Sequence, residues 1–159
     1  MVVEAGEEVT TGPLPVSRGV FRMMEVASVE MRLPDQYPVL TLVETEGGSR
    51  QLAFRIGLPE AVALSHALAG TMAPRPLTHD LFSDVLERFA VDVVAVRLVG
   101  RFGATYLGEL DLMGSRGREV VACRPTDGIT LAVRQKVRAP ILADERLLST
   151  TGDVPGSGA

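Results

Sequence analysis

Runs in which apolar and polar residues alternate predict six β-strands along the chain. They are expected at residues 26–33, 39–46, 51–56, 93–99, 105–113 and 119–124. Gly-Gly at 47–48 indicates a hairpin between the second and third strands, and Gly-Ser-Arg-Gly at 114–117 indicates a turn between the last two. A short extended segment at 140–142 would add a seventh strand, and a brief helical turn is expected around Glu145.

Three further segments carry apolar residues at helical spacing. The first helix is expected from Pro59 to the residue before Gly70, because proline fits a first helical turn and glycine favours the C-terminal end. Thr78 is the expected N-cap of the second helix. Thr126 is the expected N-cap of the third, which should run to about Val137.

Hairpins separated by helices, without regular βαβ alternation, are typical of an α+β fold. We therefore expect a mixed, largely antiparallel sheet of about six to seven strands with three main helices. Residues 20–148 should form this domain, while residues 1–19 and 149–159 lack periodicity and are expected to be flexible extensions. Translation from either Met1 or Met24 is compatible with this organisation.

Composition narrows the class of protein. The chain has 159 residues, 46% of them hydrophobic and 23% charged, which fits one globular domain. No apolar run reaches the roughly 18 residues of a membrane-spanning helix, so no membrane association is expected. The single cysteine excludes a disulfide within the chain and favours a cytoplasmic location. With 20 acidic and 16 basic residues, the net charge of −4 is unfavourable for gripping duplex DNA.

Two predicted helix starts repeat one pattern, Arg-Pro-Leu-Thr-His-Asp at 75–80 and Arg-Pro-Thr-Asp at 124–127. In each, an arginine precedes a helix start whose free N–H groups could hold a phosphodiester. Asp80 and Asp127 could then bind a divalent ion, with His79 as acid or base. The alternative is structural: both aspartates complement helix dipoles and pair with nearby arginines.

Two smaller features have simpler explanations. Glu109 and Asp111 point to one face of a strand and are expected to pair with Arg116 or Arg118 across the hairpin. Cys123 lies at a strand end and is expected to be buried as a small apolar residue instead of acting as a nucleophile.

Four spaced segments together resemble a known family. They are Ile-Gly-Leu-Pro-Glu-Ala at 56–61, Arg-Pro-Leu-Thr-His-Asp-Leu at 75–81, Ala-Cys-Arg-Pro-Thr-Asp-Gly-Ile at 122–129, and Ala-Pro-Ile at 139–141 with Glu145 downstream. Over about residues 24–148 the chain resembles the bifunctional nuclease (BFN) domain family. The resemblance implies an α+β fold, association into homo-oligomers (dimers or higher), and nuclease action on RNA and DNA. Gly128 stands where the family more often has alanine, a difference of up to about 1 kcal/mol in helix propensity.

The resulting hypothesis is metal-assisted hydrolysis of phosphodiester bonds in single-stranded RNA or DNA. The expected catalytic residues are His79, Asp80 and Asp127, and the expected phosphate-binding residues are Arg75 and Arg124. Mg²⁺ or Mn²⁺ would be held by carboxylates drawn from Asp80, Asp127, Glu60 and Glu145. The alternative is a non-catalytic oligomeric binding or scaffold domain in which these charges pair with each other, with a phosphorylated small molecule as a further candidate ligand.

Overall fold

The strands of this protein pair into one open sheet in the computed structural model, which describes residues 19–47 and 49–150. They are β1 (Phe21–Glu30), β2 (Val39–Glu44), β3 (Arg50–Arg55), β4 (Asp92–Phe102), β5 (Thr105–Gly114), β6 (Gly117–Cys123), β7 (Ile141–Asp144) and β8 (Ser149–Thr150). Their order is β6-β5-β4-β7-β1-β2-β3-β8. Among the described strands, only β4 and β7 pair in parallel.

The predicted α+β class is confirmed, with eight strands in place of six or seven. The additional strand is β8, which adds only two residues, paired with Arg50 and Gln51 of β3. Two residues are too few to show alternation. The first strand begins at Phe21, earlier than expected, because its start pairs with β7 and a bulge between Val26 and Ser28 interrupts the alternation. The predicted flexible extensions, residues 1–19 and 149–159, fall largely outside the described residues, but Ser149 and Thr150 form β8 instead of belonging to a flexible tail.

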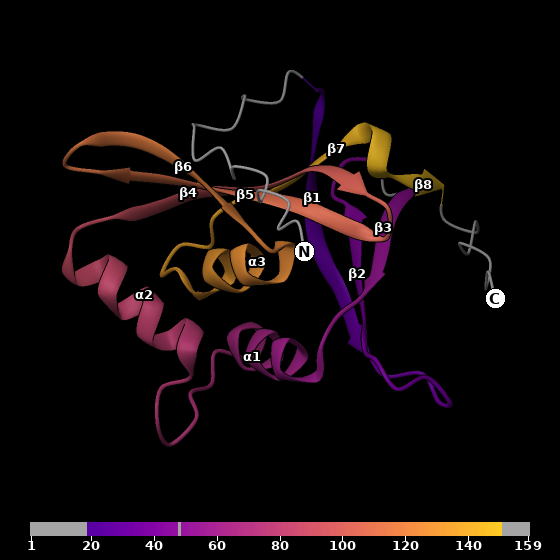
Figure 1. Cartoon of the computed structure of the whole chain (residues 1–159), viewed down its shortest axis with the longest axis horizontal. Helices are drawn as coiled ribbons and strands as arrows, with labels where there is room; N and C mark the ends of the chain where they lie inside the picture. Colours follow the sequence, from indigo (N-terminus) through magenta and orange to yellow (C-terminus); the bar gives the residue numbers. More distant parts are fainter. Residues whose placement is uncertain (1–18, 48, 151–159) are drawn as a thin grey trace, which may run out of the picture.

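Three helices lie on one side of the sheet: α1 (Leu58–Ala69), α2 (Thr78–Arg88) and α3 (Pro125–Arg134) (Figure 1). The predicted glycine end of α1 is confirmed, since Gly70 is its C-cap with φ of 65°. The predicted threonine N-caps are wrong, because Leu77 and Arg124 occupy the N-cap positions and both threonines lie inside the helices. The third helix also ends at Arg134, before the expected boundary. The short 3-10 helix Glu145–Leu147 matches the expected helical turn.

The helices differ in how well they are covered. Eight of the ten residues of α3 are buried, because α3 packs on β4 and β5 and is flanked by α1 and α2. Of the eleven residues of α2, only Asp80 and Leu86 are buried. The apolar stripe of α2 is therefore largely left outside the core, and it forms part of the site described below.

Charged side chains on β4, β5 and β6 pair within the sheet. The Arg97 guanidinium lies 3.3 Å from Glu109 and 3.6 Å from Asp111, and Arg118 also pairs with Asp111. This confirms the cross-hairpin pairing expected for Arg118, whereas Arg116 contacts Glu119 at 3.9 Å. Glu109 and Asp111 are thus committed to structural ion pairs.

Alanine at position 128 is expected to destabilise the protein. A Cβ at Gly128 would lie 2.5 Å from Cγ2 of Val96 and 3.0 Å from Sγ of Cys123. The close approach of α3 to β4 thus outweighs the better helix propensity of alanine. Gly128→Ala should lower the free energy of unfolding by about 1–3 kcal/mol, as overpacked cores do. Urea unfolding measures the change, with Ser65→Ala on an exposed position of α1 as control. A more stable Gly128→Ala protein would contradict this packing argument.

Candidate functional site

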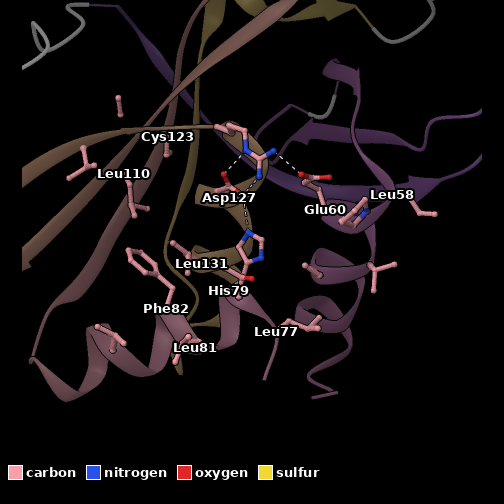
Figure 2. Close-up of a pocket in the computed structure, with 18 residues that line it drawn as sticks. Leu58, Glu60, Leu77, His79, Leu81, Phe82, Leu110, Cys123, Asp127 and Leu131 are labelled. Carbon is pink, nitrogen blue, oxygen red and sulfur yellow. Dashed lines mark hydrogen bonds and ion pairs between the residues drawn. The ribbon is translucent and has the colours of Figure 1, made fainter. Parts of the chain in front are cut away.

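The first turns of all three helices meet at one place in the structure (Figure 2). Glu60 is in the first turn of α1, His79 is the second residue of α2, and α3 contributes Arg124 at its N-cap and Asp127 in its first turn. We call these four residues the polar strip. Each lies at the N-cap or in the first turn of its helix, so local sequence determines its position on the helix, and tertiary packing brings the three helix starts together.

Hydrogen bonds link the polar strip into a continuous chain. Nε of Arg124 donates to Oδ2 of Asp127 at 2.7 Å, and Nη2 donates to Oδ1 at 3.0 Å. Nη1 of Arg124 donates to Oε1 of Glu60 at 2.7 Å. Nε2 of His79 lies 2.9 Å from Oδ1 of Asp127. Arg124 is thus clamped between two carboxylates, and one of these also orients the imidazole.

Two groups of the polar strip remain available to a ligand. A guanidinium has five N–H donors, and Arg124 uses three of them on described residues, while its side chain stays 64% exposed. Because a carboxylate only accepts, Nε2 of neutral His79 carries the hydrogen that Asp127 receives, which makes Nδ1 an acceptor that bonds to no described residue. The strip can therefore donate to an anion and exchange a proton at adjacent positions.

Acid should weaken the stabilising contribution of Asp127. Burial raises the pKa of this carboxyl, but hydrogen bonds from Arg124 and His79 outweigh burial and hold the pKa below its ordinary value of 3.8. The contribution is fully present above that value and is lost as pH falls through the lower pKa of the folded state. Urea unfolding of the wild type and Asp127→Asn should therefore differ most near neutral pH, with a difference that shrinks below pH 3.8. A difference independent of pH would contradict this.

The structure does not bring the other predicted site residues to the polar strip. Oδ1 of Asp80 pairs with Arg134 at 2.7 Å, and Oδ2 accepts from the backbone N–H of Leu77 at 2.9 Å. Glu145 pairs with Arg22 at 3.1 Å in a separate cluster. Arg75 is exposed on the connection between α1 and α2 and does not line the groove described next.

The predicted metal site, with ligands drawn from Asp80, Asp127, Glu60 and Glu145, is not assembled in this arrangement. Within the described ranges, no three His, Cys, Asp or Glu side chains are grouped so that they could hold a metal ion. Glu60 and Asp127 are the candidate ligands that lie together, and both already bind Arg124. The residues as arranged therefore do not fit the predicted cluster, and the groups that the polar strip presents are an imidazole, two carboxylates and a guanidinium.

The polar strip lies within an apolar groove of about 960 Å³ that sequence reasoning missed. Six large side chains along it are between 40% and 58% exposed. They are Leu58 and Val62 of α1, Leu81, Phe82 and Val85 of α2, and Val121 of β6. One signal was present in the sequence: the second helix carries an apolar stripe of Leu81, Phe82, Val85, Leu86 and Phe89, of which only Leu86 is buried.

Cys123 also lines the groove. Burial, followed by the nearby charge of Asp127, raises the pKa of its thiol to about 11. The thiol is therefore protonated at neutral pH, which supports the expectation that Cys123 is not a nucleophile.

Comparison with known proteins identifies the family. The family model described as "Bifunctional nuclease domain" matches residues 40–154. The chain belongs to the bifunctional nuclease domain family. The matched region holds the whole polar strip and all three helices, and membership suggests a nuclease-related function.

Two curated relatives extend the comparison. The uncharacterized protein Rv1829 of Mycobacterium tuberculosis strain H37Rv is 35% identical over 129 residues, covering 81% of this chain and 75% of the relative. The uncharacterized protein MT1877 of strain CDC 1551 gives the same values. Their names assign no activity to the BFN domain.

Within the described residues, no helix has the length and apolar character needed to span a membrane.

Proposed function

We propose that this BFN-domain protein is a nuclease that hydrolyses phosphodiester bonds in RNA or DNA at the polar strip. The observation that carries the proposal is the 2.9 Å contact between His79 and Asp127, beside an exposed guanidinium with two N–H donors that no described residue accepts. An imidazole oriented by a carboxylate is a common acid–base device, and a guanidinium matches the geometry of a phosphate. Family membership supports the same class of reaction.

Each group has a distinct part in this reaction. The free N–H donors of Arg124 bind non-bridging phosphate oxygens and stabilise the negative charge that grows in the transition state. His79, in its imidazolium form, gives the Nδ1 proton to the leaving oxygen as that P–O bond breaks. A water molecule forms the new P–O bond and releases one proton to the solvent, and the imidazole takes a proton back from the solvent before the next cycle. Asp127 keeps the ring oriented and stabilises the imidazolium.

A cleavage assay with a matched variant tests the proposal. Short labelled single-stranded RNA and DNA are incubated with the wild type, Asp127→Asn and Asp84→Asn in Mg²⁺, Mn²⁺ or EDTA. Asp84 is an exposed residue of α2 outside the groove lining, so its variant controls for a contaminating nuclease. We expect the wild type and Asp84→Asn to cleave equally and Asp127→Asn to lose at least about tenfold. Equal cleavage by all three proteins, or by none, would reject the assignment.

A second candidate is a non-catalytic oligomeric binding domain. It is favoured by the pairing of Arg124 with both Glu60 and Asp127 inside the chain, because two carboxylates and one guanidinium leave the strip with a net negative charge while His79 is neutral. The salt dependence of oligonucleotide binding discriminates the two. A nuclease that contacts phosphates should lose affinity for the oligonucleotide steeply as salt rises. If the protein binds no oligonucleotide even at low salt, the non-catalytic oligomeric domain is favoured.

A further inference from the structure

The groove has a polar centre and two apolar sides. In Figure 2, Leu58 lies on one side of the His79–Asp127 pair, whereas Phe82 and Leu110 lie on the other. We call Leu58 and Val62 the α1 wall. We call the apolar side chains of the next helix that line the groove the α2 wall; they are Leu81, Phe82 and Val85.

Both walls are open to solvent. Leu58 is 55% exposed on the α1 wall, and Leu81 is 58% exposed on the α2 wall. Monomeric proteins rarely leave several large apolar side chains exposed around one concave surface, and such surfaces commonly bind ligands or partners. A natural occupant should therefore cover both walls and place a polar group between them.

We propose that the two walls are nucleobase subsites. This inference rests on the proposed function and adds the form of the substrate. The phosphodiester lies on the polar strip, where Arg124 has free donors, and the bases on its two sides turn apart to pack against the α1 wall and the α2 wall. The substrate is then a single strand whose adjacent bases are unstacked from each other.

The arrangement favours this occupant over others. A single-chain amphiphile has its polar group at one end, so it would leave one wall uncovered. Bases in a duplex are paired and stacked, so they cannot separate into two walls. The net charge of −4 offers little to hold a duplex by its phosphates alone. A dinucleotide step in a single strand has a charged centre between two flat, largely apolar groups, as the groove requires.

The α1 wall and the α2 wall should contribute unequally to the affinity for a single strand. Phe82 is the aromatic residue of the α2 wall, and bases stack on aromatic rings more strongly than they pack on aliphatic groups. The α1 wall is built of Leu58 and Val62, which offer aliphatic contacts. Loss of the base that faces Phe82 should therefore weaken binding more than loss of the base that faces the α1 wall.

Binding without cleavage tests the inference separately from the proposed reaction. Short single-stranded oligonucleotides containing 2-aminopurine are titrated into His79→Gln protein at low salt, with and without Phe82→Ala. Val137→Ala is the control, because Val137 is 86% exposed and does not line the groove. We expect Phe82→Ala to weaken binding by about fivefold to a hundredfold, the range for loss of one stacked base, and Val137→Ala to leave it unchanged.

An abasic substitution makes the same test without altering the protein. Oligonucleotides lacking one base should bind more weakly, and a duplex of the same sequence should bind more weakly than the single strand. If binding depends on the bases but the wild type does not cleave, the nucleobase subsites are supported and the proposed nuclease activity is rejected. If cleavage occurs and is unaffected by Phe82→Ala and by abasic sites, the nucleobase subsites are rejected and the proposed nuclease activity is retained.

A second copy of the chain is the main competing occupant, and sedimentation of the same variants detects it. If Phe82→Ala dissociates an oligomer while oligonucleotide binding stays unchanged, the groove is a subunit interface and the inference is overturned. Duplex binding as tight as single-strand binding overturns it as well.

Discussion

Replacing His79 by glutamine is expected to lower the rate of phosphodiester cleavage by about two to four orders of magnitude, the usual contribution of a positioned acid–base group. The side-chain amide of glutamine can still donate a hydrogen bond to Asp127, so the polar strip should stay connected. Glutamine cannot exchange a proton at the position of Nδ1. The loss should therefore appear in kcat, while KM and the thermal midpoint change little.

His66 provides the matched control for this experiment. Its Nδ1 lies 3.0 Å from Oγ1 of Thr71, and the residue does not line the groove. His66→Gln should cleave at the wild-type rate. Equal losses in both variants, or cleavage by His79→Gln at the wild-type rate, would show that His79 does not act on the substrate.

Removing the carboxylate of Asp80 is expected to destabilise the protein by about 3–5 kcal/mol, the usual result of breaking a buried ion pair from one side. Asp80 is 3% exposed and binds Arg134, whose side chain is only 11% exposed. Asp80→Ala would leave that guanidinium buried without its carboxylate and would also remove the acceptor for the Leu77 N–H. Urea unfolding at neutral pH measures the change.

The exposed Glu87–Lys136 pair gives the comparison. Both side chains are more than half exposed, so Glu87→Ala should shift the unfolding midpoint far less than Asp80→Ala. Stability of Asp80→Ala equal to that of Glu87→Ala would contradict the structural role of the buried pair.

Asp80→Ala also distinguishes a structural role of Asp80 from the catalytic role that the sequence predicted for it. Cleavage is measured at low temperature and expressed per folded molecule. If Asp80 only holds α2 against α3, activity per folded molecule should be retained. Loss of activity in fully folded Asp80→Ala would instead support Asp80 as a catalytic or metal-binding residue.

Local sequence predicted most of the secondary structure because its signals act between near neighbours. Alternation located the strands of the sheet, and Pro59 and Gly70 marked the ends of α1. The sequence missed β8 because two residues form a strand only through pairing with Arg50 and Gln51, which lie about a hundred positions away. The cost assigned to Gly128 was likewise incomplete, since only packing places Val96 against it.

The amino-acid sequence by itself determined that His79, Asp80 and Asp127 lie in first helical turns. Because the two motifs are similar, they predicted equivalent roles for Asp80 and Asp127. Tertiary structure decided that Asp127 faces the groove and that Asp80 turns inward to Arg134. It also created the groove, which is lined by residues of α1, α2 and β6 among others. The local sequence at a helix start determines the position of a residue on its helix. The surface that its side chain contacts depends on the elements packed around the helix, and those elements are distant in the sequence.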